Sequence, residues 1–190
     1  MRKLSLLCRS FTAASLIGCG LAAIGSLASV TNPASAADEL WPQWRGEAQN
    51  GVASGDHFPT QWSEEKGVDW KVKLPGSGGS TPVVVGTNAF LTYGADNKNH
   101  LAAINLKNGK TEWTVELGTD RGNKHRKGSG SNPSAVTDGK HVYAYFRSGD
   151  LGCVDTDGNV KWELNLQEKY GEDTLWWDLG TSPLLTDNAI

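Results

Sequence analysis

The chain has 190 residues, with 18 Lys and Arg against 21 Asp and Glu, and it is rich in Gly (23) and Trp (8). This length predicts one domain or little more, because a domain averages about 150 residues. A composition of 38% hydrophobic and 21% charged residues excludes collagen and a long disordered tail, and 3 Cys are too few for a disulfide scaffold.

The N-terminal segment has the pattern of an export signal. Lys and Arg occur only at its start, a long apolar run follows, and no further charge occurs until Asp38. We therefore expect residues 1–36 to be a secretory signal peptide that is cleaved after Ala36. Two alternatives stay open. Leu16–Cys19 resembles a lipoprotein motif, which would place a lipid on Cys19, and an uncleaved apolar run of about 20 residues can anchor a chain in a bilayer.

Export has consequences for charge and for cysteine chemistry. Cleavage after Ala36 leaves 15 Lys and Arg against 21 Asp and Glu, a net charge of −6. We predict no nucleic-acid partner, because such a partner requires a basic surface. Cys153 would be the single Cys left, and we expect it to be buried in a strand, without a disulfide.

Two landmarks recur along the rest of the chain: Trp113 and Trp162 are 49 residues apart, and Pro82, Pro133 and Pro183 follow one another at 51 and 50 residues. One is a strand in which Trp, an aliphatic residue and Leu alternate with mostly polar residues, and the other is a strand with Pro near its start. Gly109 and Gly158 each lie about four residues before a repeated Trp and mark hairpin turns. The first landmark occurs at Trp70–Leu74, Trp113–Leu117 and Trp162–Leu166, and the second at Ser80–Val84, Ser131–Ala135 and Thr181–Leu185.

Each complete repeat predicts four short antiparallel strands. The first has them at 82–85, 89–93, 101–105 and 111–117, and the second at 134–137, 141–147, 151–155 and 160–166. Four such strands in about 40 to 50 residues are typical of a β-propeller blade, whereas a β-sandwich of unrelated strands is the alternative. We expect an all-β propeller with a lead-in segment at 37–68 and repeats over 69–190. The blades lie at about 80–117 and 131–166, and a third begins near 181.

The order strand, Asn or Asp, Gly, Trp in 105–113 and 155–162 resembles the pyrroloquinoline-quinone-type (PQQ-like, BamB-like) β-propeller repeat of secreted bacterial proteins. The start of the mature chain, Trp41–Gly46, is also similar to proteins of that family. The resemblance implies an eight-bladed propeller in which the repeated Trp docks between neighbouring blades. It does not imply bound quinone, because the repeat occurs both in quinoprotein dehydrogenases and in cofactor-free scaffolds.

Two whole blades with a partial blade on each side cannot close a ring by themselves. We therefore expect Trp70–Leu74 to be the last strand of one blade and Thr181–Leu185 to be the first strand of another. The sequence then reads as a fragment of a longer propeller, and assembly of several copies into one ring is the alternative.

Strand direction predicts which loops share one end of the blades. In an up-and-down blade, the turn between the second and third strands emerges at the same end as the connection to the next blade. Long connections on a rigid scaffold are where binding residues concentrate. We expect any ligand or partner at this end, which presents the connections 118–130 and 167–180 together with Asp96, Lys98, Arg147 and Asp150.

The two connections differ in their chemistry. The first is cationic and could bind an anion, or it could be an ordinary solvated loop. The second carries two adjacent Trp beside carboxylates, which could stack on a sugar or a cation, or could fold back as a plug over the next blade. Because their charges are opposite, the two connections could also contact each other. The candidate residues are Arg121, Lys124, His125, Arg126, Lys127, Arg147, Trp176, Trp177 and Asp178.

Other chemical motifs are weak. The Gly-rich segment 75–80 lacks the Lys-Ser/Thr ending of a nucleotide loop, and 155–159 places Gly at the wrong position for a calcium loop. The His residues lack zinc-ligand spacing. The resemblance implies an adjacent Cys pair in quinoprotein dehydrogenases, which this stretch lacks. We predict no catalytic, cofactor-binding or metal-binding residues in this chain.

These observations favour an exported, non-catalytic propeller that serves as a binding or assembly scaffold in the cell envelope. A protein or envelope component is the expected partner, and a membrane would be involved only through an uncleaved signal or a lipid on Cys19. The alternative is the N-terminal fragment of a quinoprotein dehydrogenase, which would use PQQ and calcium.

Overall fold

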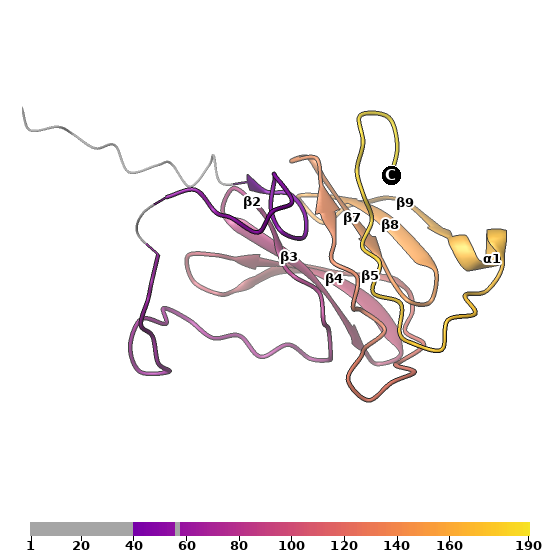
Figure 1. Ribbon diagram of the computed structural model, residues 1–190, viewed down its shortest axis with the longest axis horizontal. Helices are drawn as coiled ribbons and strands as arrows, with labels where there is room; N and C mark the ends of the chain where they lie inside the picture. The colour runs from indigo at the N-terminus through magenta and orange to yellow at the C-terminus, as the bar shows by residue number, and fades with distance from the viewer. Residues whose placement is uncertain (1–39, 56–57) are drawn as a thin grey trace, which may run out of the picture. The chain divides into compact units, whose positions relative to one another are not determined.

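The computed structural model describes residues 40–55 and 58–190, drawn as a coloured ribbon in Figure 1. The expected signal peptide, Ala36 and Cys19 lie outside these ranges. Within them the fold is nearly all β, with two antiparallel sheets that correspond to the two expected repeats. No helix in these ranges is long and apolar enough to cross a membrane.

The first sheet contains the four expected strands and one more. The central hairpin is longer than predicted, because Asp96 and Asn97 adopt φ values of 50° and 59° and close it with a tight two-residue turn. The strand order is β1 (Leu40–Trp41), β2 (Val83–Val85), β3 (Asn88–Ala95), β4 (Lys98–Asn105) and β5 (Thr111–Thr119).

The extra strand comes from the segment that sequence reasoning assigned to the lead-in. Leu40 and Trp41 pair with Val85 and Val84 at the free edge of β2. Directly after β1, the Pro42 carbonyl accepts a hydrogen bond of 2.8 Å from the Thr137 N–H in the second sheet. The N-terminal segment therefore contacts the first strands of both repeats.

The second sheet confirms the second repeat, with a shorter first strand. Ser134 lies outside β6 because its N–H donates to the Ser182 hydroxyl and its own hydroxyl accepts from the Thr81 N–H, at 3.0 and 2.8 Å. These bonds join successive repeats instead of extending the ladder. The strand order is β6 (Val136–Thr137), β7 (His141–Tyr145), β8 (Asp150–Asp155) and β9 (Val160–Asn165).

A short helix that the sequence analysis did not predict, α1 (Leu166–Tyr170), follows β9. The Asn165 side chain caps it by accepting hydrogen bonds of 3.0 Å from the Gln167 and Glu168 N–H groups. The Gln167 side chain is buried and donates to the Arg147 carbonyl, 2.8 Å away. The helix therefore fixes the start of the second connection against the turn between β7 and β8.

The two sheets share one hydrophobic core. Fully buried Phe90 and Leu101 from the first sheet belong to the same cluster as Phe146 of the second. Between the sheets, a Cβ atom on Gly152 would lie 2.7 Å from a methyl carbon of Leu117, so the Leu117 side chain rests directly on the backbone of β8. Burying each such side chain contributes about 1.5–3 kcal/mol, which makes the two repeats a packed pair. Cys153 is 3% exposed in β8, as expected.

The docking of the repeated Trp is confirmed at the two positions where a following repeat is present. Trp70 Nε1 donates to the Leu106 carbonyl at 2.7 Å, and its ring covers Gly109 in the hairpin that joins β4 and β5. A Cβ at Gly109 would lie 2.8 Å from that ring, so the position requires Gly. The Trp70 side chain thus links its own segment to the outer hairpin of the next repeat.

Trp113 repeats this arrangement one unit later. Its Nε1 donates to the Thr156 carbonyl at 3.0 Å, and its ring covers Gly158 between β8 and β9. Trp162 differs, because its side chain remains 37% exposed.

Two expected strands are absent from the described residues. Neither Trp70–Leu74 nor Thr181–Leu185 forms a strand, because no described strand pairs with either segment. The predicted alternation still holds in the first segment, where Trp70, Val72 and Leu74 are half-buried and the two intervening Lys residues are exposed.

Candidate functional site

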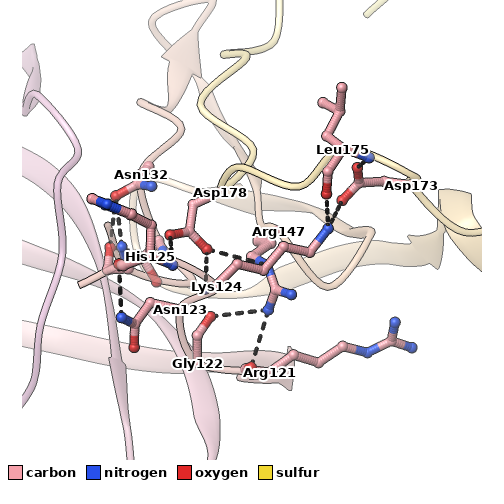
Figure 2. A network of polar contacts seen from close by, with 12 residues as sticks. Arg121, Gly122, Asn123, Lys124, His125, Asn132, Arg147, Asp173, Leu175 and Asp178 are labelled. Carbon is pink, nitrogen blue, oxygen red and sulfur yellow. Dashed lines mark hydrogen bonds and ion pairs between the residues drawn. The ribbon is translucent and has the colours of Figure 1, made fainter. Parts of the chain in front are cut away.

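The two long connections meet at the Asp178 carboxylate, which is 4% exposed. One oxygen accepts from the Lys124 N–H at 2.5 Å, and the other accepts from the His125 N–H at 2.8 Å. Figure 2 shows Asp178 reaching the backbone of the first connection. These bonds support the alternative in which the two oppositely charged connections contact each other.

Arg147 holds the same junction from the turn between β7 and β8. Its Nε lies 3.4 Å from Asp178 Oδ1, an ion-pair distance, and its side chain is 13% exposed. The guanidinium also donates to the carbonyls of Arg121 and Gly122 at 3.0 and 3.1 Å (Figure 2). A buried ion pair with further hydrogen bonds holds its partners strongly, because losing either partner leaves an unpaired buried charge.

A second tie joins Lys124 to the far part of the second connection. Its ammonium lies 3.1 Å from an Asp173 carboxylate oxygen and also donates to the Leu175 carbonyl. Partial burial alone would raise the pKa of Asp173, but hydrogen bonds from the Leu175 N–H and Lys124 more than offset this, so the pKa lies below its ordinary value. Asp173 is therefore ionised at neutral pH and paired with Lys124.

Glycine residues let these carboxylates approach the backbone. A Cβ on Gly128 would lie 2.2 Å from Asp178 Oδ2, and one on Gly130 would lie 2.0 Å from Asp120 Oδ1. Sequence reasoning missed Asp120 and both glycines as parts of the junction. The Gly-Ser-Gly run at 128–130 is the signal that could have indicated a close backbone contact there.

Trp176 and Trp177 stack on each other and stay exposed. Their ring centroids are 3.8 Å apart, and the two residues are 70% and 51% exposed. The His125 ring meets Trp177 edge-on, with centroids 5.7 Å apart. The alternative in which these Trp residues fold back over the next blade stays a prediction, because no strand of that blade occurs in the described residues.

Two further basic residues follow His125 in the first connection. Arg126 and Lys127 are exposed, and no carboxylate in the described ranges lies within 4.0 Å of either. Arg121 faces Glu172 at 3.5 Å, an exposed pair that contributes little to stability.

The candidate residues therefore divide into two groups. Lys124, Arg147 and Asp178 tie the two connections together, and they are engaged within the protein. The exposed residues are Arg121, Arg126, Lys127, Trp176 and Trp177. His125 belongs to both sets, because its N–H donates to Asp178 and its ring meets Trp177.

Asp150, which sequence reasoning placed on the same face, points into the protein instead. Its carboxylate accepts hydrogen bonds from Asn99, Ser148 and Asn165 at 3.1, 2.6 and 2.8 Å. Because Asn99 is fully buried and lies in the first sheet, this network joins the two repeats.

The described residues do not assemble a carboxylate cluster of the kind that a calcium ion would need. No group of three or more His, Cys, Asp or Glu side chains in these ranges could hold a metal ion. Burial raises the pKa of the Cys153 thiol, which stays protonated inside β8. Among the described residues, neither a metal-binding cluster nor an ionised thiol is therefore present.

Residues 49–189 match the family described as outer membrane protein assembly factor BamB. The chain belongs to this family. The match covers both sheets apart from β1, and the BamB-like membership confirms the PQQ-like propeller repeats inferred from the Trp and Gly spacing.

Three solved structures match parts of the chain. A quinohemoprotein alcohol dehydrogenase from Comamonas testosteroni matches 70% of this chain at 24% identity, with a TM-score of 0.55. BamB from Moraxella catarrhalis matches 51% of the chain at 17% identity, with a TM-score of 0.39. A quinohemoprotein alcohol dehydrogenase from Pseudomonas putida matches 62% at 18% identity, with a TM-score of 0.44.

The matched regions cover 20% of the Comamonas dehydrogenase, 26% of Moraxella BamB and 17% of the Pseudomonas dehydrogenase. The chain thus spans a small part of the length of each. No curated protein sequence matches it. BamB-like repeats therefore occur both in an assembly factor and in dehydrogenases, and the fold alone does not choose between these functions.

Proposed function

We propose that the protein is an exported, non-catalytic β-propeller repeat protein that serves as a binding or assembly scaffold in the cell envelope. Its partner would be a protein or another envelope component. One observation carries the proposal. The buried Arg147–Asp178 ion pair joins the two connections, whereas Trp176 and Trp177 in the second connection remain exposed.

Rigid presentation of exposed aromatic side chains supports a binding role. Trp and Arg are enriched among the residues that dominate interface affinity, and ordering a loop in advance reduces the entropy lost on binding. Asp178 and Arg147 supply that ordering. Arg126 and Lys127 supply exposed positive charge directly after His125, whose ring contacts Trp177. The face defined by Arg121, Arg126, Lys127, Trp176 and Trp177, which we call the connection face, therefore favours a partner with an apolar patch and acidic residues.

Site-specific photo-crosslinking in the natural host tests this proposal. A photoreactive amino acid replacing Trp176 should give a discrete adduct with an envelope component. The same substitution at Trp62, which is 68% exposed but lies outside the connection face, should not. Equal adducts from both positions, or none from Trp176, would contradict the scaffold proposal.

Export itself is part of the proposal. We infer cleavage after Ala36, with acylation at Cys19 as the runner-up. The intact mass of the protein purified from the cell envelope distinguishes a chain that begins at residue 37 from one that begins with a lipid-modified Cys19. A mass that includes residues 1–36 in a protein left in the cytoplasm would contradict export.

The second candidate is a piece of a quinoprotein dehydrogenase, favoured by the likeness to the Comamonas enzyme in fold. In that case PQQ and calcium would be held largely outside the described residues. Oxidation of an alcohol or sugar by the full natural protein, on addition of quinone and calcium, would support this alternative and overturn the non-catalytic proposal.

A further inference from the structure

A cavity of about 420 Å³ lies where the N-terminal segment meets the starts of the repeats. Gln43, Trp44 and Gln49 contribute from the N-terminal segment, Asn132 from the residues before β6, and Thr181 and Ser182 from the segment that follows the second connection. Its volume falls in the range of about 300–1,000 Å³ that is usual for small-ligand pockets. None of these residues belongs to the connection face.

The lining combines amide and hydroxyl groups with apolar surface from Trp44, Pro183 and Leu184, and it carries no ionisable side chain. Gln43, Gln49 and Asn132 contribute amides, each of which can both donate and accept hydrogen bonds. Thr and Ser residues contribute hydroxyl groups with the same dual capacity. A charged ligand would lose its hydration without meeting an opposite charge, so the cavity favours a neutral ligand with many hydroxyl groups.

Trp44 adds an aromatic surface to this polar lining. The residue is 57% exposed, although the Arg45 guanidinium lies 5.7 Å from the centroid of its ring. An indole ring offers a large apolar face with little conformational entropy to lose. The apolar C–H face of a sugar ring is a neutral surface of matching shape.

Hydrogen bonds within the protein orient several of the polar groups. Gln49 Nε2 donates to Gln43 Oε1 at 3.3 Å, and the Ser182 hydroxyl accepts from the Ser134 N–H at 3.0 Å. Asn132 Oδ1 accepts from the N–H and the hydroxyl of Ser129. In the part of the chain that the structure describes, the Asn132 Nδ2 and the Thr181 hydroxyl have no hydrogen-bond partner, so both remain available to a ligand.

We propose that this cavity binds a neutral carbohydrate, with a sugar ring stacked on Trp44 and its hydroxyl groups hydrogen-bonded by Asn132 and Thr181. This site goes beyond the proposed scaffold function, because it uses the N-terminal segment and the repeat starts instead of the connection face. The scaffold proposal can fail while this one holds, and the reverse.

Saturation-transfer NMR of the full natural protein tests the proposal, with cellobiose, maltose and di-N-acetylchitobiose as probes. We expect at least one of the three to bind. Trp44→Ala should weaken that binding about tenfold, because it removes the stacking surface. Thr181→Val, which keeps the shape and removes the hydroxyl, should weaken it about threefold to tenfold.

Trp62→Ala and Trp176→Ala are the matched controls, since both remove an exposed Trp that does not line the cavity, and both should leave the sugar affinity unchanged. The proposal is overturned if none of the three disaccharides binds. It is also overturned if Trp44→Ala binds as tightly as the natural protein, or if glucose 6-phosphate binds more tightly than the neutral sugars.

Discussion

Trp113 and Trp162 occupy the same position in consecutive repeats, yet one is docked and the other is exposed. Trp113 donates to the Thr156 carbonyl and covers Gly158, whereas Trp162 is 37% exposed beside Val160 and Leu164, which are 41% and 40% exposed. The two strands have the same alternating pattern. In the described ranges, a hairpin of the next repeat lies against Trp113 and none lies against Trp162 in this way. Burial of the repeated Trp is therefore a property of two adjacent repeats.

The largest expected effect on stability comes from removing the docked Trp113 side chain. Trp113→Ala should lower the free energy of unfolding by about 3–5 kcal/mol, because it removes a large side chain packed between two repeats. Trp162→Ala should cost about 1 kcal/mol, since its side chain is already partly in water. Urea unfolding of both variants measures the difference. Equal losses would mean that docking between the repeats contributes little.

The next largest effect should come from removing the buried Asp178 carboxylate, which joins the two connections. Asp178→Ala leaves the Arg147 guanidinium buried without its carboxylate, so we expect a loss of about 3 kcal/mol. Hydrogen exchange should rise in 118–130 and 167–180. Glu172→Ala removes only an exposed partner of Arg121 and should change stability by less than about 0.5 kcal/mol. Unchanged exchange in Asp178→Ala would show that the carboxylate does not order the connections.

The hairpin that receives Trp113 offers a sharper test of contact geometry. Gly158→Ala places a Cβ 2.9 Å from the Trp113 ring at a φ of 92°, so we expect it to lower stability by about 2 kcal/mol. Gly171→Ala is the control, because its φ is 103° but its Cβ would meet no atom within 4 Å. Backbone strain alone should cost about 1 kcal/mol there. Thermal unfolding that shows equal losses would assign the whole effect to strain.

The smallest expected effect is a change at the exposed Trp162 when the nearby Asp138 carboxylate is protonated at low pH. Partial burial alone would raise the pKa of Asp138, but hydrogen bonds from the His141 and Lys140 N–H groups and the His141 ring more than offset it, and the pKa falls from 3.8 to about 2. A lowered carboxylate pKa stabilises the fold fully above about pH 4, and this contribution is lost as the pH falls towards 2.

The titration of Asp138 should shift the NMR signal of Trp162 more than that of Trp113. The Tyr143 hydroxyl donates to Asp138 at 3.2 Å, and the Tyr143 ring lies 6.1 Å from that of Trp162. We expect the indole NMR signal of Trp162 to shift with a midpoint near pH 2 and to lose this step in Asp138→Asn. A step that survives in Asp138→Asn belongs to another group.

Much of the fold could be predicted because its signals are local. Alternation with period two, together with Gly109 and Gly158 in hairpin turns, identifies β2 to β9 to within a few residues. The errors occur where pairing decides the outcome. Trp70–Leu74 has the alternation but no described partner strand, and β1 forms from two residues only because the edge of β2 is free.

The candidate site was predicted less completely. The sequence indicated that Arg147, Lys124 and Asp178 would lie at one end of the blades, because strand direction fixes where loops emerge. It could not show that these three side chains join the two connections to each other, because Lys124 and Asp178 are 54 residues apart in the sequence. Asp150 was placed on the same face, but the tertiary structure directs it to buried Asn99.

The sequence by itself determined the repeat, the strands and the turns, because a period-two pattern and a Gly turn act over neighbouring residues. Only the tertiary structure decided which Trp is docked, which charges are paired and which aromatic rings stay exposed. Each of these depends on residues about 30 to 50 positions apart meeting through packed sheets, and no local pattern specifies such a meeting.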